Sequence, residues 1–427
     1  MVFNRNLVLT TNFYANSFNR DWWRQSSNSR QRPNDAADPV CGGMENLNTT
    51  CGNEGRLRAY FNWGIESRAR ANHRLLGFRS EAEFGGRFHS ELQDRRQLNG
   101  SLPSSRTGNL VEDNERRNRA FSGFIQNRLI AGEWAVVPGF RIERIHFERT
   151  NRLTGASGKT DMTQLLPGLG VTYSPASHTT FLAGVHRGFA PPRTEDIISN
   201  TGGMVELDPE LSWNYEAGFR TTPKEGLRLE GTFFTMDYEN QIVPASLAGG
   251  VGATLTNAGE TLHQGFELTA RADTGPLFGW RHNLYGRIAF TYIPVAKFVG
   301  QRFSNVAGFS DVSVSGNRLP YSPEHLHTIG LGYMHPDGLE LFVEAVQVSS
   351  QYTEDLNTVE GSADGQRGRI PGQLTWNATA SYGLENIGAT VFVSVKNIMD
   401  RTQIVDRSRG LLPNSPRIWQ SGIRFSF

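Results

Sequence analysis

The two cysteines of the chain, Cys41 and Cys51, carry the chemistry that depends most clearly on spacing. They lie close together in a segment rich in glycine and asparagine, with no nearby histidine to complete a zinc-type ligand set. Two neighbouring cysteines in a polar loop can form a disulfide, which persists in an oxidising compartment. We therefore predict a loop disulfide between them. The alternative is a pair of unpaired thiols.

Histidine is a common metal ligand, and the chain has ten histidines. His325 and His327 are two positions apart, a spacing that places both on one face of a strand and can chelate a metal. The same spacing suits two side chains near a membrane boundary, which is the interpretation we favour. His186 could line a lumen or bind haem, but nothing else supports such a role. The sequence therefore predicts no metal site.

Charged side chains on alternate positions could act as general acids or bases if they met in a cleft. They include Glu81, Glu83, Glu216 and Glu267, but arginines occur beside them at the same spacing. Ion pairs across neighbouring strands are therefore the expected role. The chain contains no G-x-S-x-G, H-E-x-x-H, phosphate-loop or dinucleotide-binding motif. We predict that the protein is not an enzyme and has no catalytic residues.

The segments that carry these residues alternate in polarity. Near the end of the chain, Trp419 and Ile423 fall on one parity, whereas Gln420 and Arg424 fall on the other. A β-strand points successive side chains to opposite faces, so this segment has one apolar and one polar face. The same pattern recurs along the whole chain. A charged face cannot form the core of a soluble protein, but it can line a water-filled or plugged lumen.

The bulk composition agrees with strands that contact lipid on one face. Mean hydropathy is −0.44 and hydrophobic residues make up 37%, and no apolar run is long enough for a membrane-spanning helix. Strands with two different faces average to a neutral hydropathy, so such values do not exclude a membrane barrel. A β-propeller would show a repeat of about 40–50 residues, which is absent. A net charge of +1 gives no indication of nucleic-acid binding.

We therefore predict an all-β fold, an antiparallel transmembrane β-barrel with about sixteen strands present. The strands are expected to begin near Leu7, Gly64, Phe78, Arg119, Trp134, Gln164, Thr179, Ser212, Leu227, Gly265, Asn283, His325, Leu339, Leu374, Ala389 and Arg417. Short turns alternate with long polar connections at residues 25–55, 97–115, 191–210, 298–320, 352–370 and 399–416. Short periplasmic turns and long external loops are typical of such barrels.

Several segments, in order, resemble motifs of TonB-dependent outer-membrane receptors. They are Arg-Gly-Phe-Ala-Pro-Pro at 187–192, Leu-Asp-Pro-Glu-Leu-Ser-Trp-Asn-Tyr-Glu-Ala-Gly at 207–218, Asn-Ala-Gly-Glu at 257–260 with Gly-Phe-Glu at 265–267, Leu-Pro-Tyr-Ser-Pro-Glu-His at 319–325, Asn-Ile-Met-Asp at 397–400 and the closing strand at 416–427. The resemblance covers essentially the whole chain. Residues 13–24 and 64–68 are most similar to ferric-dicitrate-type receptors.

The resemblance implies an outer-membrane protein of a Gram-negative bacterium. Family members have an N-terminal plug and a barrel of about 22 strands. We expect residues 1–427 to be the C-terminal portion of the barrel domain, with the plug and roughly the first six strands missing. Residues 1–6 do not resemble a signal peptide, which indicates a mature chain or a missing N-terminal part. The implied function is uptake of a ferric chelate, energised by TonB, ExbB and ExbD through the plug.

Ferric citrate and other iron chelates are anionic, so the resemblance implies arginines at the external mouth, where the guanidinium fork suits carboxylates. The long connections supply Arg193, Arg302, Arg318, Arg367, Arg369, Arg401, Arg407 and Arg409, with Gln366, Gln403 and Asn414 as neutral donors. These residues are the predicted ligand-binding set. Solvated arginines, or arginines paired with lipopolysaccharide phosphates, are the alternative. No covalently bound cofactor is expected, and lipid and lipopolysaccharide are expected to surround the barrel.

Two other functions fit the same pattern. Sixteen strands could close by themselves into a passive porin with an aqueous lumen. The long loops could also serve as an adhesive surface or a docking surface for phage. Transport across a lipid bilayer separates the porin from the receptor, whereas the sequence does not separate the docking surface from it.

Overall fold

The computed structural model describes residues 2–4, 6–25, 53–102, 104–244, 255–306, 308–408 and 410–426. Cys41, Cys51 and Arg409 lie outside the described residues, and so does the predicted disulfide. The chain forms two compact units. The first comprises residues 1–129, 138–167 and 191–208, and the second comprises residues 130–137, 168–190 and 209–427. The prediction that residues 1–427 form a single barrel domain stays a prediction.

Long antiparallel strands make up the first unit. Its elements are β1 (Val2–Asn4), β2 (Leu7–Gln25), β3 (Asn53–Leu75), β4 (Phe78–Gly100), most of β5 (Asn109–Ala131), β6 (Trp134–Asn151) and β7 (Ser157–Ala176), and the short helix α1 (Thr194–Ile197). β3 pairs with β4 without a bulge from Asn53 to Leu75. About 9–11 residues of a tilted strand cross a bilayer, so strands of 23 residues extend well beyond it.

The turn between β3 and β4 shows why these strands pair tightly. Leu76 and Gly77 connect Leu75 to Phe78, and both have positive φ angles, 53° and 85°. Two central residues with positive φ form a type I′ turn, whose twist matches that of the flanking strands. The turn fixes the register, and the ladder then continues along the whole of β3.

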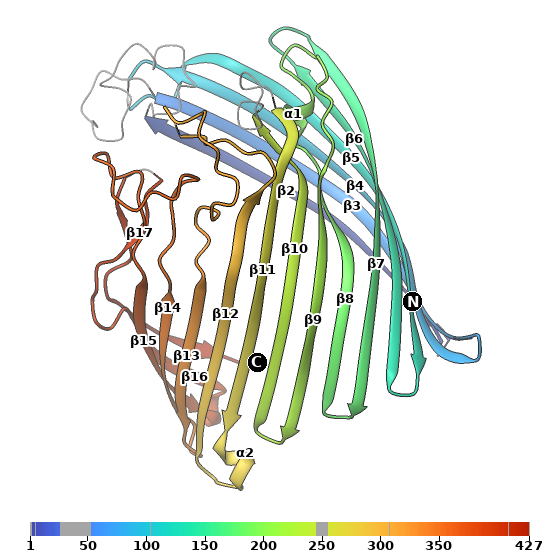
Figure 1. Ribbon diagram of the computed structural model, residues 1–427, viewed down its shortest axis with the longest axis vertical. Coiled ribbons are helices and arrows are strands. Elements are labelled where there is room, and N and C mark those ends of the chain that lie inside the picture. Colours follow the sequence, from blue (N-terminus) through green and yellow to red (C-terminus); the bar gives the residue numbers. More distant parts are fainter. Residues whose placement is uncertain are drawn as a thin grey trace. The chain divides into compact units, whose positions relative to one another are not determined.

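The second unit contains the remaining strands. They are β8 (Thr179–Ala190), β9 (Glu210–Lys224), β10 (Leu227–Pro244), β11 (Leu255–Asp273), β12 (Asn283–Val299), β13 (His325–Met334), β14 (Leu339–Val348), β15 (Gln373–Leu384), β16 (Ala389–Lys396) and β19 (Ile418–Phe425), with the short β17 (Ile404–Asp406) and β18 (Leu412–Pro413), the helix α2 (Thr274–Phe278) and the 3₁₀ helix η2 (Glu385–Ile387). Each of these strands is antiparallel to its neighbour, and Figure 1 shows β8 to β12 side by side.

The predicted strand number is confirmed. The described residues contain sixteen strands of eight or more residues, β2 to β16 and β19. Four strand starts were wrong. β3 begins at Asn53 rather than Gly64, and β5 at Asn109 rather than Arg119. β7 begins at Ser157 rather than Gln164, and β11 at Leu255 rather than Gly265. In residues 112–119 both faces of the strand carry polar side chains, so alternation is lost while backbone pairing continues. The predicted loop at 97–115 shrinks to residues 101–108 for the same reason.

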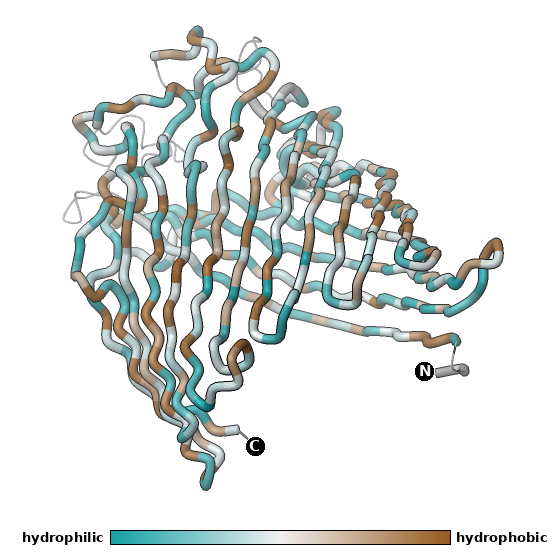
Figure 2. Tube along the Cα trace, turned by 60° about the horizontal axis from the view of Figure 1, so that its bottom comes forward, coloured by the Kyte–Doolittle hydropathy of each residue, from teal (hydrophilic) through white to brown (hydrophobic). Residues whose placement is uncertain are grey.

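One face of the strands carries large apolar side chains that no core covers. On β13, Ile329 is 51% exposed and Leu331 is 69% exposed, and on β19 Trp419 and Ile423 are 68% and 60% exposed. Figure 2 shows apolar and polar residues alternating along successive strands. Burying such a side chain in hydrocarbon is worth about 1.5–3 kcal/mol, so this face is suited to lipid. Among the helices described, none is long and apolar enough to cross a membrane.

Candidate functional site

Three long connections of the second unit form one hydrogen-bonded assembly, which we call the loop platform (residues 300–324, 349–372 and 397–417). The Asp355 carboxylate accepts hydrogen bonds from Ser304 Oγ at 2.6 Å and from the Asn305 backbone N–H at 2.7 Å. Tyr321 donates its hydroxyl to Asp406 Oδ1 at 2.7 Å and thereby joins the first connection to the third. The platform presents a fixed arrangement of side chains, because each connection is bonded to the other two.

Three residues of the predicted ligand-binding set use their polar groups in hydrogen bonds within single connections or to β12. The Arg318 guanidinium donates to the carbonyl oxygens of Ser322 at 2.8 Å and Ile293 at 2.7 Å. Gln403 and Asn414 bind each other's backbone, because the Gln403 N–H donates to Asn414 Oδ1 at 2.8 Å and the Asn414 N–H donates to the Gln403 carbonyl at 2.9 Å. Their polar groups are occupied by the protein itself.

Three other arginines of the set keep free donors. Arg302 lies over the Phe298 ring at 5.4 Å, and its Nε and Nη1 atoms have no hydrogen-bond partner within the described residues. Burial lowers the pKa of Arg302, and the charge of Asp355 offsets part of this effect. Arg407 donates through Nη1 to the carbonyl of Arg367 at 3.3 Å, so the structure brings these two arginines together. These guanidinium groups can bind an anion.

The rest of the predicted set is dispersed. Arg193 is exposed at the start of α1 in the first unit, and Arg369 is exposed on the loop platform. Arg401 accepts hydrogen bonds through its backbone carbonyl from Asn397 and Asn414. The backbone N–H of Gln366 donates to Asp364 at 3.0 Å. None of these contacts indicates a ligand, and the whole set remains a prediction.

The first unit contains a group of arginines that sequence reasoning missed. Arg58, Arg95, Arg116 and Arg149 come from β3, β4, β5 and β6, one from each strand, and we call them the arginine cluster. Glu112 lies between Arg58 at 3.4 Å and Arg95 at 3.6 Å. The side chains of Arg58 and Arg116 are 2% and 4% exposed. Buried guanidinium groups need partners, so this cluster requires anionic groups beside it.

The second partner of the arginine cluster comes from residues 191–208, which we call the 191–208 segment. Glu195 on α1 accepts a hydrogen bond from Arg95 at 2.7 Å and another, very short, from Arg116. Burial alone would raise the pKa of Glu195, but the charge of Arg116 and the hydrogen bonds from both arginines lower it to about 2. Glu195 is therefore ionised at neutral pH.

Hydrogen bonds to uncharged groups also attach the 191–208 segment to the strands. Arg149 donates to the Ile198 carbonyl at 2.8 Å and to Asn200 Oδ1 at 2.9 Å. Thr194 donates its hydroxyl to Asn118 at 2.9 Å. Ile198 is completely buried, so the segment packs closely against the strands of the first unit.

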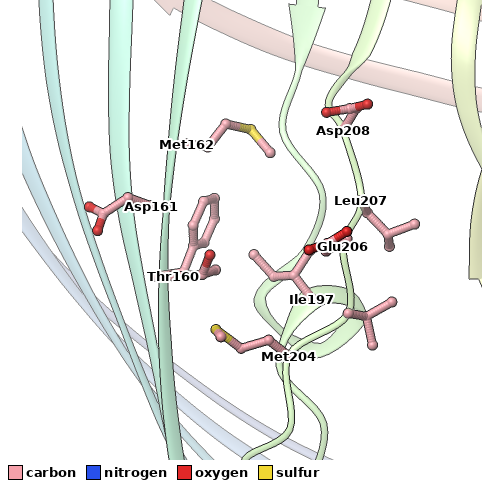
Figure 3. Close-up of a pocket in the computed structure, with 10 residues that line it drawn as sticks. Thr160, Asp161, Met162, Ile197, Met204, Glu206, Leu207 and Asp208 are labelled. Atoms are coloured by element: carbon pink, nitrogen blue, oxygen red, sulfur yellow. The ribbon is translucent and has the colours of Figure 1, made fainter.

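A pocket of about 500 Å³ lies between this segment and β6 and β7. Figure 3 shows Met162 on β7 pointing toward the segment and Met204 on the segment pointing toward β7. Asp161 points away from the segment and lies 3.1 Å from Nδ1 of His146. Glu206 and Asp208 add carboxylates, so the lining combines polar and apolar side chains.

The histidine pair forms a ladder of rings. His325 stacks on Tyr292 at 4.8 Å, and His327 stacks on Phe290 at 4.6 Å. The rings occupy the same alternate positions as the exposed Ile329. Within the described ranges, no group of three or more histidine, cysteine or acidic residues is arranged to hold a metal ion.

Residues 2–398 match the family described as TonB dependent receptor-like, beta-barrel. The chain belongs to this family. TonB-dependent receptors are outer-membrane proteins of Gram-negative bacteria and not enzymes, so the predicted family, location and non-enzymatic character are confirmed. The strand pattern described above is that of the receptor barrel.

Solved structures of receptors in this family share the fold. The ferric citrate transporter FecA in the unliganded form aligns with a TM-score of 0.79 and 22% identity over 99% of this chain and 59% of that chain. The siderophore receptor PiuA from Acinetobacter baumannii aligns at 0.74 and 14% over 99% and 62%. BauA, the ferric preacinetobactin receptor from Acinetobacter baumannii, aligns at 0.71 and 13% over 99% and 60%. This receptor chain spans about three fifths of the length of these proteins.

The sequence of this TonB-dependent receptor contains a signal for the arginine cluster. The residues that carry it were predicted to lie in a loop rather than on a strand. Residues 112–117 (Glu-Asp-Asn-Glu-Arg-Arg) carry acidic and basic side chains at high density, which suggests paired charges on a strand. Because residues 97–115 were predicted to be a loop, Arg95, Glu112 and Arg116 were not placed on neighbouring strands. The contribution of Glu195 depends on contact between distant parts of the chain, for which the sequence carries no signal.

Proposed function

We propose that this chain is the barrel portion of a receptor that takes up a ferric chelate, with carboxylate-rich chelates such as ferric citrate as the first class to test. Membership of the family supports uptake of a scarce ligand across the outer membrane. The names of the solved relatives include a ferric citrate transporter and a ferric preacinetobactin receptor. Their low identity to this chain supports the fold, so the ligand itself is proposed here on the arginines.

The observation that carries this proposal is the set of free donors on the loop platform. Arg302, Arg367 and Arg407 lie on connections that hydrogen bonds hold together, and each keeps guanidinium donors that no other described residue uses. A guanidinium group binds a carboxylate with two parallel hydrogen bonds, which suits an anionic chelate. Preorganised donors also reduce the entropic cost of binding.

The partners follow from the same proposal. In the complete receptor the plug connects the barrel to TonB, ExbB and ExbD, which supply the energy for uptake. The ferric chelate is cargo, and the protein binds no cofactor covalently. Lipid and lipopolysaccharide cover the apolar face of the strands, where side chains such as Leu331 are exposed.

Titration of the purified full-length receptor with ferric citrate tests the ligand class. Binding can be followed by quenching of tryptophan fluorescence. We expect saturable binding, and we expect the double variant Arg302→Gln with Arg367→Gln to weaken it at least about tenfold, because each charge-assisted hydrogen bond contributes about 1.5–3 kcal/mol.

Arg281→Gln is the matched control. Arg281 is exposed just before β12, whereas Arg302 follows the other end of the same strand, so the control removes an equal charge away from the loop platform. Absence of binding to ferric citrate and to other ferric chelates would refute the proposed ligand class. An equal loss of affinity in the control would show that the effect is a general one of charge.

A further inference from the structure

We propose that the arginine cluster is a second site for a carboxylate anion, and that Glu195 fills it as an internal counter-ion until a ligand carboxylate takes its place. The chemical class of the incoming anion, a carboxylate, is inferred from the proposed function. The site itself rests on the first unit alone, and none of its residues belongs to the predicted ligand-binding set.

The charges of the cluster do not balance. Three of the four guanidinium groups pair with two carboxylates, Glu112 and Glu195, whereas Arg149 interacts with both through charge alone and Asp196 acts on Arg116 in the same way. Glu112 is fixed on β5, so it stays beside Arg58 and Arg95. Glu195 is the carboxylate that contacts Arg116, whose side chain is 4% exposed. If Glu195 left, the buried charge of Arg116 would need another anion at the same place.

The cluster offers more donors than Glu195 uses. The Nε atom of Arg116 is buried and has no hydrogen-bond partner among the described residues, and the Nε atom of Arg95 has only the longer ion pair with Glu112 at 3.6 Å. Glu195 brings one carboxylate, and both of its oxygens are already engaged by these two arginines. A ligand with several carboxylates could occupy the position of Glu195 and also satisfy the remaining donors. The cluster is therefore built for a larger anion than the side chain it holds.

Glu195 can be replaced because of where it lies in the chain. Its four-residue helix α1 belongs to a connection and not to a strand, so its removal breaks no strand pairing. The exchange substitutes one carboxylate for another and keeps the charge-assisted hydrogen bonds of Arg95 and Arg116. The contacts of Arg149 with Ile198 and Asn200 involve a carbonyl and an amide, so they do not compete with the anion for charge.

Replacement of Glu195 by a ligand carboxylate would also change the pocket shown in Figure 3. Ile197 and Met204, on the segment that carries Glu195, line that pocket opposite Met162. Ile197 is two residues from Glu195 and is buried, so a movement of Glu195 away from Arg116 displaces one wall of the pocket. Occupation of the arginine cluster by an anion is thereby connected to the shape of the adjacent cavity.

Metal-free citrate is the probe for this proposal, and Glu195→Gln is the informative variant. The amide keeps the shape of the side chain but removes the competing charge. In the full-length receptor, titration calorimetry at low salt is expected to show citrate binding at least about tenfold tighter in Glu195→Gln than in the wild type. Adding Arg116→Gln to that variant should abolish the gain.

Asp196→Asn is the matched control, because it removes an equal charge from the same helix without a hydrogen bond to the cluster. Equal citrate affinity in the wild type, Glu195→Gln and Asp196→Asn would overturn the proposal. Should Glu195→Gln fail to fold, amide hydrogen exchange of residues 194–205 in the wild type decides. Saturating citrate should accelerate this exchange, and unchanged exchange would overturn the proposal.

The two proposals fail separately. Ferric citrate that binds through Arg302 and Arg367, with no effect of Glu195→Gln on metal-free citrate, leaves the receptor function intact and removes the second site. Tight binding of metal-free citrate by Glu195→Gln, with no ferric chelate bound by the wild type, supports the second site and refutes the proposed cargo.

Discussion

Arg116 on β5 and Glu195 on α1 form an ion pair although 79 positions separate them in the sequence. The pair attaches a long connection to the polar face of the strands in the first unit. Because Arg116 is almost completely buried, the pair is stronger than an ion pair between two solvated side chains. Together with the contacts of Arg149 and Thr194, it holds the 191–208 segment on these strands.

Acidification should release the 191–208 segment. The pKa of Glu195 is lowered to about 2, so its contribution to stability is complete above the unfolded value of about 4.3 and is lost as the pH falls toward 2. Asp196 acts in the opposite sense, because burial and the charge of Glu195 raise its pKa. The protection factors of the amides of residues 194–205, which correct exchange for its intrinsic dependence on pH, should therefore fall between about pH 4.5 and 2. In Glu195→Gln, exchange should be fast at neutral pH and lose this dependence.

Asp355→Asn should loosen the loop platform without affecting the strands. The substitution weakens the hydrogen bonds to Ser304 and Asn305, and a lost buried hydrogen bond to a charged group costs about 1.5–3 kcal/mol. Limited proteolysis should cut residues 300–324 faster than in the wild type. Asp311→Asn, at an exposed position of the same connection, should leave the rate unchanged. Equal rates for the two variants would contradict the role given to Asp355.

Leu331→Arg should impair insertion into the membrane, because Leu331 lies on the apolar face and is 69% exposed. An arginine facing the middle of the bilayer costs about 2–4 kcal/mol. Thr328→Arg is the control on the opposite face of β13, where polar side chains are tolerated. Urea titration in lipid vesicles measures the free energy of unfolding of both variants. A larger loss for Thr328→Arg would reverse the assignment of the faces.

Substitutions in the turn between β3 and β4 should change stability through backbone strain alone. No atom lies within 4 Å of a Cβ added at Gly77, so Gly77→Ala tests its positive φ, with an expected loss of about 1 kcal/mol. Leu76 also has a positive φ and is exposed, and asparagine tolerates this conformation better. Leu76→Asn should therefore be neutral or stabilising in the same urea titration, and destabilisation would contradict the turn type.

The sequence located strands well where a short turn precedes them. The starts at Phe78 and Leu227 were predicted correctly, because Gly77 and Gly226 mark turns with positive φ. The starts of β3 and β5 were placed too late: residues 53–56 and 112–119 have no apolar side chain on either face, although alternation in β3 already begins at Leu57. An alternating pattern of polar and apolar residues marks the part of a strand that contacts lipid. Backbone hydrogen bonds extend the strands beyond the lipid bilayer.

The candidate site was predictable only in part. Arginines in long polar connections were found, and Arg302 and Arg367 remain suited to an anion. The structural use of Arg318 was not predictable, because its partners are backbone carbonyls whose positions depend on the folded platform. The same limit applies to Glu195, which is ordinary in sequence and acquires its role only through contact with Arg95 and Arg116.

Uptake of radioactive iron from ferric citrate, by cells that make the full-length receptor as their outer-membrane iron receptor, decides whether this receptor imports a ferric chelate. The account predicts saturable uptake that requires TonB and falls at least about tenfold in the Arg302→Gln, Arg367→Gln double variant. Uptake that is equal with and without TonB would indicate a passive pore. Absence of uptake from ferric citrate and from other ferric chelates would contradict the proposed function.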